Sequence, residues 1–225
     1  MNQLYLVATP IGNLEDITYR AVRVLSEVDL ILCEDTRVTI NLLNKYGINK
    51  PTMSYHSQSK LSKIDKILEL INEGKTLALV SDAGTPTISD PGSVLVSKIR
   101  EEYPDMEIIA IPGASALVSA LSVSGLPSSE FVFLGFLPHK KGRETLFKEI
   151  SEMKRTVVFY ESPHRIMKTL DSLKKYVGDR KVVIAREISK IYEQIVSGSS
   201  TEVEQYFLNN QDKVRGEFVV LISEK

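Results

Sequence analysis

Strand-like and helix-like segments alternate along the first half of the chain. Apolar runs at 4–8, 30–33, 77–80 and 107–111 have the length of strands, and the residues between them repeat apolar positions at helical spacing. Parallel strands need long crossover connections, which are usually helices. The alternation therefore predicts an α/β protein with a mostly parallel sheet that is covered by helices.

A second region follows the cluster GLPSSE at 125–130, whose Gly, Pro and Ser residues are typical of a linker. Its last three strand-like runs lie at 181–185, 192–198 and 216–223, with only one helical stretch among them. Strands that follow one another so closely are expected to pair antiparallel. We therefore predict two α/β domains, residues 1–125 and residues 126–225, the second with a mixed sheet.

Several classes of protein are disfavoured by composition. The apolar runs are far shorter than the roughly 20 residues that cross a bilayer, and the first residues lack the pattern of a signal peptide. We therefore expect a cytoplasmic protein without a membrane segment. The single cysteine, Cys33, lies in the apolar run DLILC and is predicted to be a buried thiol, and the three histidines show no metal-ligand spacing. No metal is predicted.

Positive charge is concentrated in the second half of the chain. The formal net charge is −1, yet residues 139–190 hold 14 Lys and Arg against 7 Asp and Glu. Such an excess can contact phosphates, although it is also typical of solvated helix faces. The loop HKKGR at 139–143 is the candidate for such a phosphate contact.

Two common nucleotide-binding motifs are excluded. The tripeptide GKT at 74–76 lacks the required earlier glycine, because that position is Glu69, and it precedes a strand instead of following one. No GxGxxG follows any strand-like run.

Several strand-like runs end in segments rich in Gly, Pro and small polar residues. In open α/β sheets, ligands lie beyond the carboxyl ends of the strands. We therefore expect these segments to line one pocket, with the alternative that each is a tight turn or a helix cap, as Asp90 and Ser115 would suit. The segments are ATPIGN (8–13), SDAGTPTISDPG (81–92), IPGASA (111–116) and FYESPHR (159–165).

Together with LILCEDTR, FLGFLP and AREISKIYE, these segments resemble the tetrapyrrole methylase superfamily, and within it the branch that methylates a cytidine 2′-hydroxyl in 16S ribosomal RNA. The resemblance runs essentially from end to end of the chain. It implies two α/β domains with S-adenosylmethionine in the cleft between them, and a homodimer.

The resemblance also implies which residues contact the cofactor S-adenosyl-L-methionine. The matching positions come from four of the segments already named and from AREISK. They are Pro10, Asp82, Ala83, Gly84, Thr85, Ser115, Ala116, Tyr160 and Ile188.

The implied substrate is 16S ribosomal RNA in the small ribosomal subunit. Two alternatives stay open: a corrin or porphyrin methyltransferase with the same fold and cofactor, and a noncatalytic RNA-binding or ribosome assembly factor. Longer members of the family continue past GEFVVLI, whereas this chain ends at Lys225. If that further segment helps to hold RNA, its absence weakens substrate binding and leaves the cofactor site intact.

Methyl transfer to a ribose hydroxyl requires alignment of donor and acceptor, and a base or a cation near the acceptor oxygen. The hypothesis from the sequence is that Glu161, Glu187 and Lys190 border this hydroxyl. Two of them have plain alternatives: Glu161 and the further candidate Arg165 are spaced to form an ion pair, and Lys190 would also suit a phosphate contact. Further candidates are Glu34, Asp35, Arg37, His164 and Arg186, of which Asp35 would also suit a helix cap and Arg186 a phosphate contact.

Overall fold

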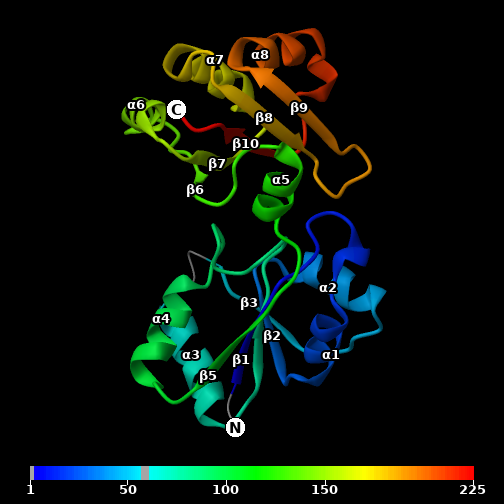
Figure 1. Cartoon of the computed structure of the whole chain (residues 1–225). Helices are drawn as coiled ribbons and strands as arrows, with labels where there is room; N and C mark the ends of the chain where they lie inside the picture. The colour runs from blue at the N-terminus through cyan, green and yellow to red at the C-terminus, as the bar shows by residue number, and fades with distance from the viewer. Residues whose placement is uncertain (1–2, 57–60) are drawn as a thin grey trace. The chain divides into compact units, whose positions relative to one another are not determined.

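The computed structural model describes residues 3–56 and 61–225 and divides into two compact units, Met1–Ser115 and Ala116–Lys225 (Figure 1). In the described residues each unit is an α/β fold built on a five-stranded sheet, which confirms the predicted fold class. The boundary expected from the sequence, near residue 125, lies at the other end of helix α5 (Ala116–Ser124). This helix packs on strands of the second unit, so the structure groups it there.

The sheet of the first unit has the order β3-β2-β4-β1-β5, and each neighbouring pair is parallel. Parallel pairing brings the carboxyl ends of these strands to one edge, which is what positions the site. The strand at 52–54 was not predicted, because three residues are too few for an alternating pattern. The strands are β1 (Gln3–Val7), β2 (Leu30–Cys33), β3 (Thr52–Ser54), β4 (Leu77–Leu79) and β5 (Glu107–Ile111).

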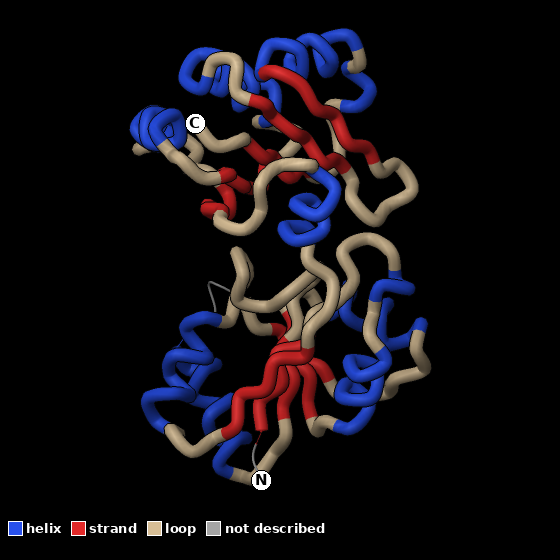
Figure 2. The backbone as a smooth tube through the Cα atoms, in the orientation of Figure 1, coloured by secondary structure: helices blue, strands red, loops and turns tan. Residues whose placement is uncertain are grey.

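Helices cover both faces of this sheet (Figure 2). Leu77 and Leu79 pack with α3 and α4, whereas Ala78 and Val80 pack with α1 and α2, as the alternation of side chains along a strand requires. Cys33 is fully buried among the latter, which confirms the predicted thiol environment. The helices are η1 (Leu14–Asp16), α1 (Tyr19–Glu27), α2 (Thr36–Lys45), α3 (Leu61–Asn72) and α4 (Ser93–Glu102).

The second unit has a mixed sheet of order β6-β7-β10-β8-β9. Strands β6 and β7 are parallel, and the other neighbouring pairs are antiparallel, as expected for the closely spaced strands at the end of the chain. The strands are β6 (Phe131–Phe136), β7 (Thr156–Glu161), β8 (Lys181–Arg186), β9 (Gln194–Ser199) and β10 (Phe218–Ile222).

The core of the second unit lies between this sheet and α6, α7 and α8, around Phe147, Phe159, Phe207 and Phe218. Helix α5 contacts β8 and β10. Among the described residues, no helix has both the length and the apolar character for a membrane crossing. The remaining elements are α6 (Arg143–Glu152), α7 (Ile166–Val177), α8 (Ser200–Asn209) and η2 (Gln211–Lys213).

Candidate functional site

The loops that leave β1 and β4 are joined by main-chain hydrogen bonds. Thr9 N donates to Gly84 O at 2.9 Å, and Gly84 N donates back to Thr9 O at 3.0 Å. The Thr9 hydroxyl also donates to Ser81 O at 3.0 Å. Reciprocal bonds of this kind fix ATPIGN against SDAGTP beyond the edge of the sheet.

Two glycines allow the loop that leaves β5 to lie close to the loops that leave β1 and β4. A Cβ atom on Gly113 would lie 3.0 Å from the Cβ of Ala8, so a larger residue at 113 would push the β5 loop away from the β1 loop. Gly84 has a φ of +85° and lies beside Ile11 and the carbonyl oxygen of Ala114. Three of the four segments predicted to share a pocket therefore meet in the first unit, and the fourth, FYESPHR, belongs to the second unit.

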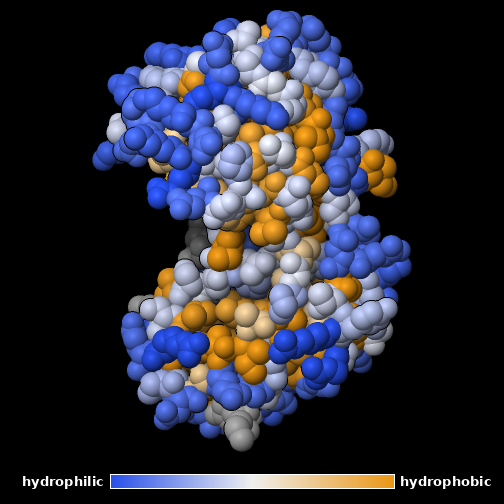
Figure 3. All heavy atoms as spheres, in the orientation of Figure 1, coloured by the Kyte–Doolittle hydropathy of each residue, from blue (hydrophilic) through white to orange (hydrophobic). Residues whose placement is uncertain are grey.

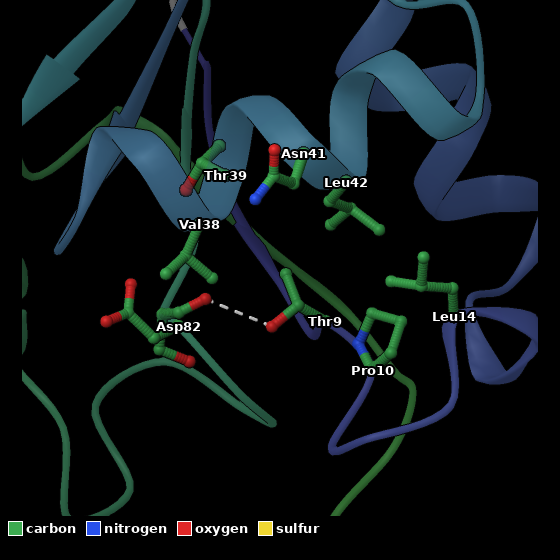
Figure 4. A pocket seen from close by; sticks show the side chains of 9 residues that line it. Thr9, Pro10, Leu14, Val38, Thr39, Asn41, Leu42 and Asp82 are labelled. Carbon is green, nitrogen blue, oxygen red and sulfur yellow. Dashed lines mark hydrogen bonds between the residues drawn. The ribbon is translucent and has the colours of Figure 1, made fainter.

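A pocket of about 180 Å³ lies between the β1 and β4 loops and helix α2 (Figure 4). Thr9, Pro10 and Asp82 line it, together with residues of α2 and Leu14. Figure 4 shows the carboxylate of Asp82 and the ring of Pro10 on opposite sides of Thr9. Its walls thus combine apolar side chains with one carboxylate.

Asp82 ties the β4 loop to the start of α2. Its Oδ1 accepts the main-chain N–H of Asp35 at 3.0 Å. Asp35 in turn is the N-cap of α2 and accepts the N–H of Arg37 at 2.8 Å, which confirms the capping alternative. The hydrogen bonds from the Arg37 side chain and main chain lower the pKa of Asp35 to about 2, so this carboxylate is engaged by its own helix.

Other acidic side chains surround the β4 loop. Burial, together with the negative charges of Glu34 and Asp82, raises the pKa of Asp90 to about 6, although a hydrogen bond from Ser81 opposes this rise. Burial also raises the pKa of Glu34, again with a contribution from Asp82. Negative charge is therefore held close together at this edge of the sheet.

Asp90 does not cap the following helix, although its place before Pro91 made that expectation reasonable. Helix α4 begins at Ser93, and its N-cap position is Gly92, with a φ of +128°. A Cβ on Gly92 would lie 2.6 Å from Leu79, so the close approach of the turn to β4 explains the glycine. Asp90 instead interacts with Ser81.

Of the other cofactor contacts that the resemblance predicts in SDAGTP and IPGASA, none lines this pocket. Gly84 is buried by the β1 loop, and the remaining residues range from half-buried to exposed. Ala83 is exposed, and Thr85, Ser115 and Ala116 are half-buried.

In the second unit, Glu161 ends β7 and is the centre of a buried polar cluster. It is 1% exposed, and its carboxylate pairs with Arg165 at 2.7 Å and with Arg143 at 3.4 Å. Thr169 of α7 donates to the same carboxylate at 2.6 Å. The pairing with Arg165 is the plain alternative that the spacing of the two residues predicted.

The two arginines hold the loop that follows β6. Arg165 Nη1 donates to Leu137 O at 2.8 Å, and Arg143 Nη1 donates to Pro138 O at 3.1 Å. Sequence reasoning did not single out Arg143, because it stands at the end of the basic run HKKGR. Arg143 differs from the preceding lysines in one respect: it is the first residue of helix α6, after Gly142.

Glu187 and Lys190 form a second polar cluster, in the loop after β8. Lys190 Nζ donates to Glu187 Oε1 at 2.8 Å and to Glu217 Oε2 at 3.0 Å, and Glu217 N donates to Glu187 Oε1 at 2.9 Å. A Cβ on Gly216 would lie 2.4 Å from Glu187 Cδ, so a side chain at this position would displace the carboxylate.

These contacts set the charges of the pair. Burial opposes ionisation of both groups, but the hydrogen bonds from Lys190 and from Glu217 N–H, with the positive charges nearby, leave the pKa of Glu187 below its ordinary value. The hydrogen bonds to Glu187 and Glu217 likewise outweigh burial and raise the pKa of Lys190. Both groups are charged at neutral pH.

Other predicted residues of the second unit have different surroundings. Tyr160 packs edge-on against Phe133, with the ring centroids 5.0 Å apart, and also contacts Phe136. Ile188 is 8% exposed. Arg186 is 5% exposed and donates to the carbonyl oxygens of Arg215 and Tyr192, so in this conformation it braces the loop and is not presented to a phosphate.

Among the residues that the structure describes, no group of three or more His, Cys, Asp and Glu side chains is arranged to hold a metal ion.

Comparison with known proteins gives consistent results at the level of sequence and of fold. The chain is 48% identical over 225 residues to "Ribosomal RNA small subunit methyltransferase I" of Thermotoga maritima, with all of both chains covered. It is 47% identical over 221 residues to the protein of the same name from Halalkalibacterium halodurans, covering 97% of this chain and 75% of that one.

Among solved structures, a cobalt precorrin-4 methyltransferase of cobalamin biosynthesis superposes with a TM-score of 0.70 at 18% identity, covering 98% of this chain and 94% of that chain. At this identity the likeness concerns the fold. The family profile described as Tetrapyrrole (Corrin/Porphyrin) Methylases matches residues 3–204. The chain therefore belongs to the tetrapyrrole (corrin/porphyrin) methylase family.

Proposed function

We propose that this protein transfers a methyl group from S-adenosylmethionine to the 2′-hydroxyl of a cytidine in the 16S ribosomal RNA of the small ribosomal subunit. The observation that carries the proposal is the 48% identity, over the whole of both chains, to a relative named as a ribosomal RNA small subunit methyltransferase. The cytidine and the 2′-hydroxyl come from the resemblance of the sequence segments to one branch of the family.

The first unit would hold part of the cofactor. The pocket beside Pro10 and Asp82 measures about 180 Å³, whereas sites for whole ligands of drug-like size measure roughly 300 Å³ or more. The residues next to it on the chain, Ala83, Gly84 and Thr85, with Ser115 and Ala116, would add main-chain contacts. Tyr160 and Ile188, in the second unit, complete the set that the resemblance predicts.

The charge of the first unit suits this cofactor. S-adenosylmethionine supplies a methyl group on a positively charged sulfur, so the donor is already activated. Asp82 uses only Oδ1 for Asp35, and Glu34 and Asp90 carry further negative charge nearby. A cationic ligand would relieve the mutual repulsion of these carboxylates, which supports its binding at this edge.

In the second unit, we assign different roles to the three residues expected at the acceptor hydroxyl. Lys190 is protonated and would favour the developing negative charge on the ribose oxygen. Glu187 is an ionised carboxylate that orients Lys190, and it can accept the hydroxyl proton. Glu161 is buried and pairs with two arginines, so it acts as a positioning residue for the loop that begins at Leu137.

The exposed residues His139, Lys140 and Lys141 follow directly on the carbonyl groups that these arginines hold. We infer that this basic loop contacts RNA phosphates, and that a fixed loop base reduces the entropy lost on binding. The resemblance further implies a homodimer that works in the cytoplasm. Light scattering after gel filtration tests the dimer.

Tritiated methyl transfer tests the proposed function. Wild-type protein, labelled S-adenosylmethionine and small subunits from cells lacking the gene should give label in 16S RNA, located at a cytidine ribose by mass spectrometry. Label only in a corrin or porphyrin would overturn the proposal, and so would cofactor binding without label in any acceptor. Glu187→Gln and Lys190→Ala should lose turnover while calorimetry finds cofactor affinity unchanged.

A further inference from the structure

The loop 187–193, between β8 and β9, exposes two large apolar side chains at its tip. Ile191 is 95% exposed and Tyr192 is 65% exposed. In Figure 3 hydrophobic atoms protrude from the second unit where Figure 1 draws this loop, close to hydrophilic ones. Single exposed apolar residues are ordinary, but adjacent ones on a braced loop need an explanation.

This loop is held in place at several points. The buried guanidinium of Arg186 donates to Tyr192 O at 3.2 Å, and Ser189 N donates to Glu193 Oε2 at 2.6 Å. Two successive turns close through Lys190 N to Glu187 O and Glu193 N to Lys190 O, both at 3.0 Å. These hydrogen bonds therefore hold Ile191 and Tyr192 in a defined position at the tip of the loop.

Basic residues lie near the exposed tyrosine. Lys190 lies two residues before it, with its Nζ paired to Glu187 and Glu217. The buried Arg186 joins the main chain of Tyr192 to that of Arg215, because it donates to the carbonyl oxygens of both residues. Arg215 is exposed. An exposed aromatic ring with a cation such as Arg215 nearby is a combination by which proteins bind single-stranded RNA, with bases stacked on the ring and phosphates near the cation.

From this arrangement we infer that Tyr192, supported by Ile191, stacks on a nucleobase of the RNA substrate next to the residue that is methylated. The inference rests on the proposed function and names a contact that specifies how the RNA strand is held. Methylation of a ribose needs the 2′-hydroxyl in line with the donor. A neighbouring base fixed by stacking would hold the strand in that position while Glu187 and Lys190 act at the hydroxyl.

A second copy of the chain is the competing occupant of this tip. A dimer contact would favour a broad apolar surface, whereas the neighbours of Ile191 and Tyr192 on the loop are the charged residues Lys190 and Glu193. The mixture of one ring, one aliphatic side chain and flanking charges favours RNA. The oligomeric state of every variant should be measured, so that a dimer contact can be recognised.

Fluorescence gives a direct test, because the chain contains no tryptophan. Tyr192→Trp places a single indole at the tip, and Tyr19→Trp places one on α1, where Tyr19 is 97% exposed. Small subunits from cells lacking the gene should quench Tyr192→Trp saturably and leave Tyr19→Trp unchanged. Equal responses of the two proteins would overturn the inference.

Binding and turnover provide the second readout. Loss of one stacked base costs about 1–3 kcal/mol, so Tyr192→Ala should weaken binding of small subunits roughly 5- to 150-fold, with most of the effect in KM. Tyr192→Phe should bind like wild type, Tyr19→Ala should have no effect, and cofactor affinity should be unchanged in all variants. The slope of affinity against salt should stay the same in Tyr192→Ala and fall in Lys140→Ala.

The outcomes separate the two proposals. If the wild-type protein labels no small subunit, the proposed function fails. If the wild type is active and Tyr192→Ala binds small subunits equally well, only the stacking inference fails. A change of Tyr192→Ala from dimer to monomer would also overturn it, because the tip would then belong to a contact between copies.

Discussion

Glu161 and Arg165 form an ion pair of 2.7 Å in which the two side chains are 0% and 15% exposed. The same carboxylate also faces Arg143, whose side chain is 8% exposed. Two guanidinium groups thus depend on one buried negative charge, and they hold the carbonyl groups of Leu137 and Pro138. The stability of the second unit and the position of the basic loop are coupled through Glu161.

Replacement of Glu161 by Gln should therefore destabilise the protein. The change leaves two buried guanidinium groups without their counter-charge, and breaking a buried pair in this way typically costs about 3–5 kcal/mol. Urea unfolding followed by circular dichroism measures the loss. Glu130→Gln is the matched control, since Glu130 pairs with Arg155 at 2.6 Å but is 69% exposed, and it should unfold almost like wild type. Equal stability of both variants would remove the positioning role.

Replacement of Asp90 by Asn should stabilise the protein in a manner that depends on pH. The native pKa of about 6 lies above the ordinary value of 3.8, so Asp90 binds its proton more tightly in the folded state. The corresponding stability is present below about pH 4 and is lost as the pH rises through 6. Asp90→Asn keeps a neutral acceptor for Ser81.

The urea midpoint of Asp90→Asn should therefore exceed that of wild type at about pH 7.5 and match it near pH 4. Asp105→Asn, at an exposed position of the same unit, should show no such trend. A difference between Asp90→Asn and wild type that does not change with pH would contradict the expected titration.

Replacement of Asp82 should weaken cofactor binding. A hydrogen bond to a charged group contributes about 1.5–3 kcal/mol, so Asp82→Ala should bind S-adenosylmethionine at least roughly tenfold less tightly in calorimetry. Asp82→Asn retains an oxygen for the N–H of Asp35 and removes only the charge. If Asn binds like wild type and Ala does not, support of α2 explains the effect. Asp65→Ala, on the exposed side of α3, is the control.

The sequence predicted the parts of this fold that depend on local patterns. Strand-length apolar runs separated by helical periodicity predicted the parallel sheet of the first unit, and Asp35 was recognisable as a helix cap. Strand β3 was not predicted, because its three residues carry no pattern of their own and its structure depends on its pairing with β2.

Contacts between distant residues decided the rest of the candidate site. Arg143 reads as one more cation of a basic run, and only its contacts with Glu161 and Thr169, 18 and 26 residues away, show that it is structural. Arg186 was a candidate near the acceptor hydroxyl, with a phosphate contact as the alternative, yet its guanidinium donates to the carbonyl groups of Arg215 and Tyr192. Residue type predicts the charge of such side chains but not the partner that burial provides.

Replacement of Gly216 by Ala should reduce turnover by displacing Glu187. The new Cβ would lie 2.4 Å from Glu187 Cδ, and the φ of +88° adds strain of about 1–3 kcal/mol for a residue with a side chain. Because Glu187 orients Lys190, the displacement should lower kcat for methyl transfer and leave S-adenosylmethionine affinity unchanged. Gly47→Ala is the matched control, since Gly47 has a φ of +64° with no atom within 4 Å of the added Cβ. It should lose stability alone, so an equal loss of turnover in the two variants would show that the position of Glu187 does not control the reaction.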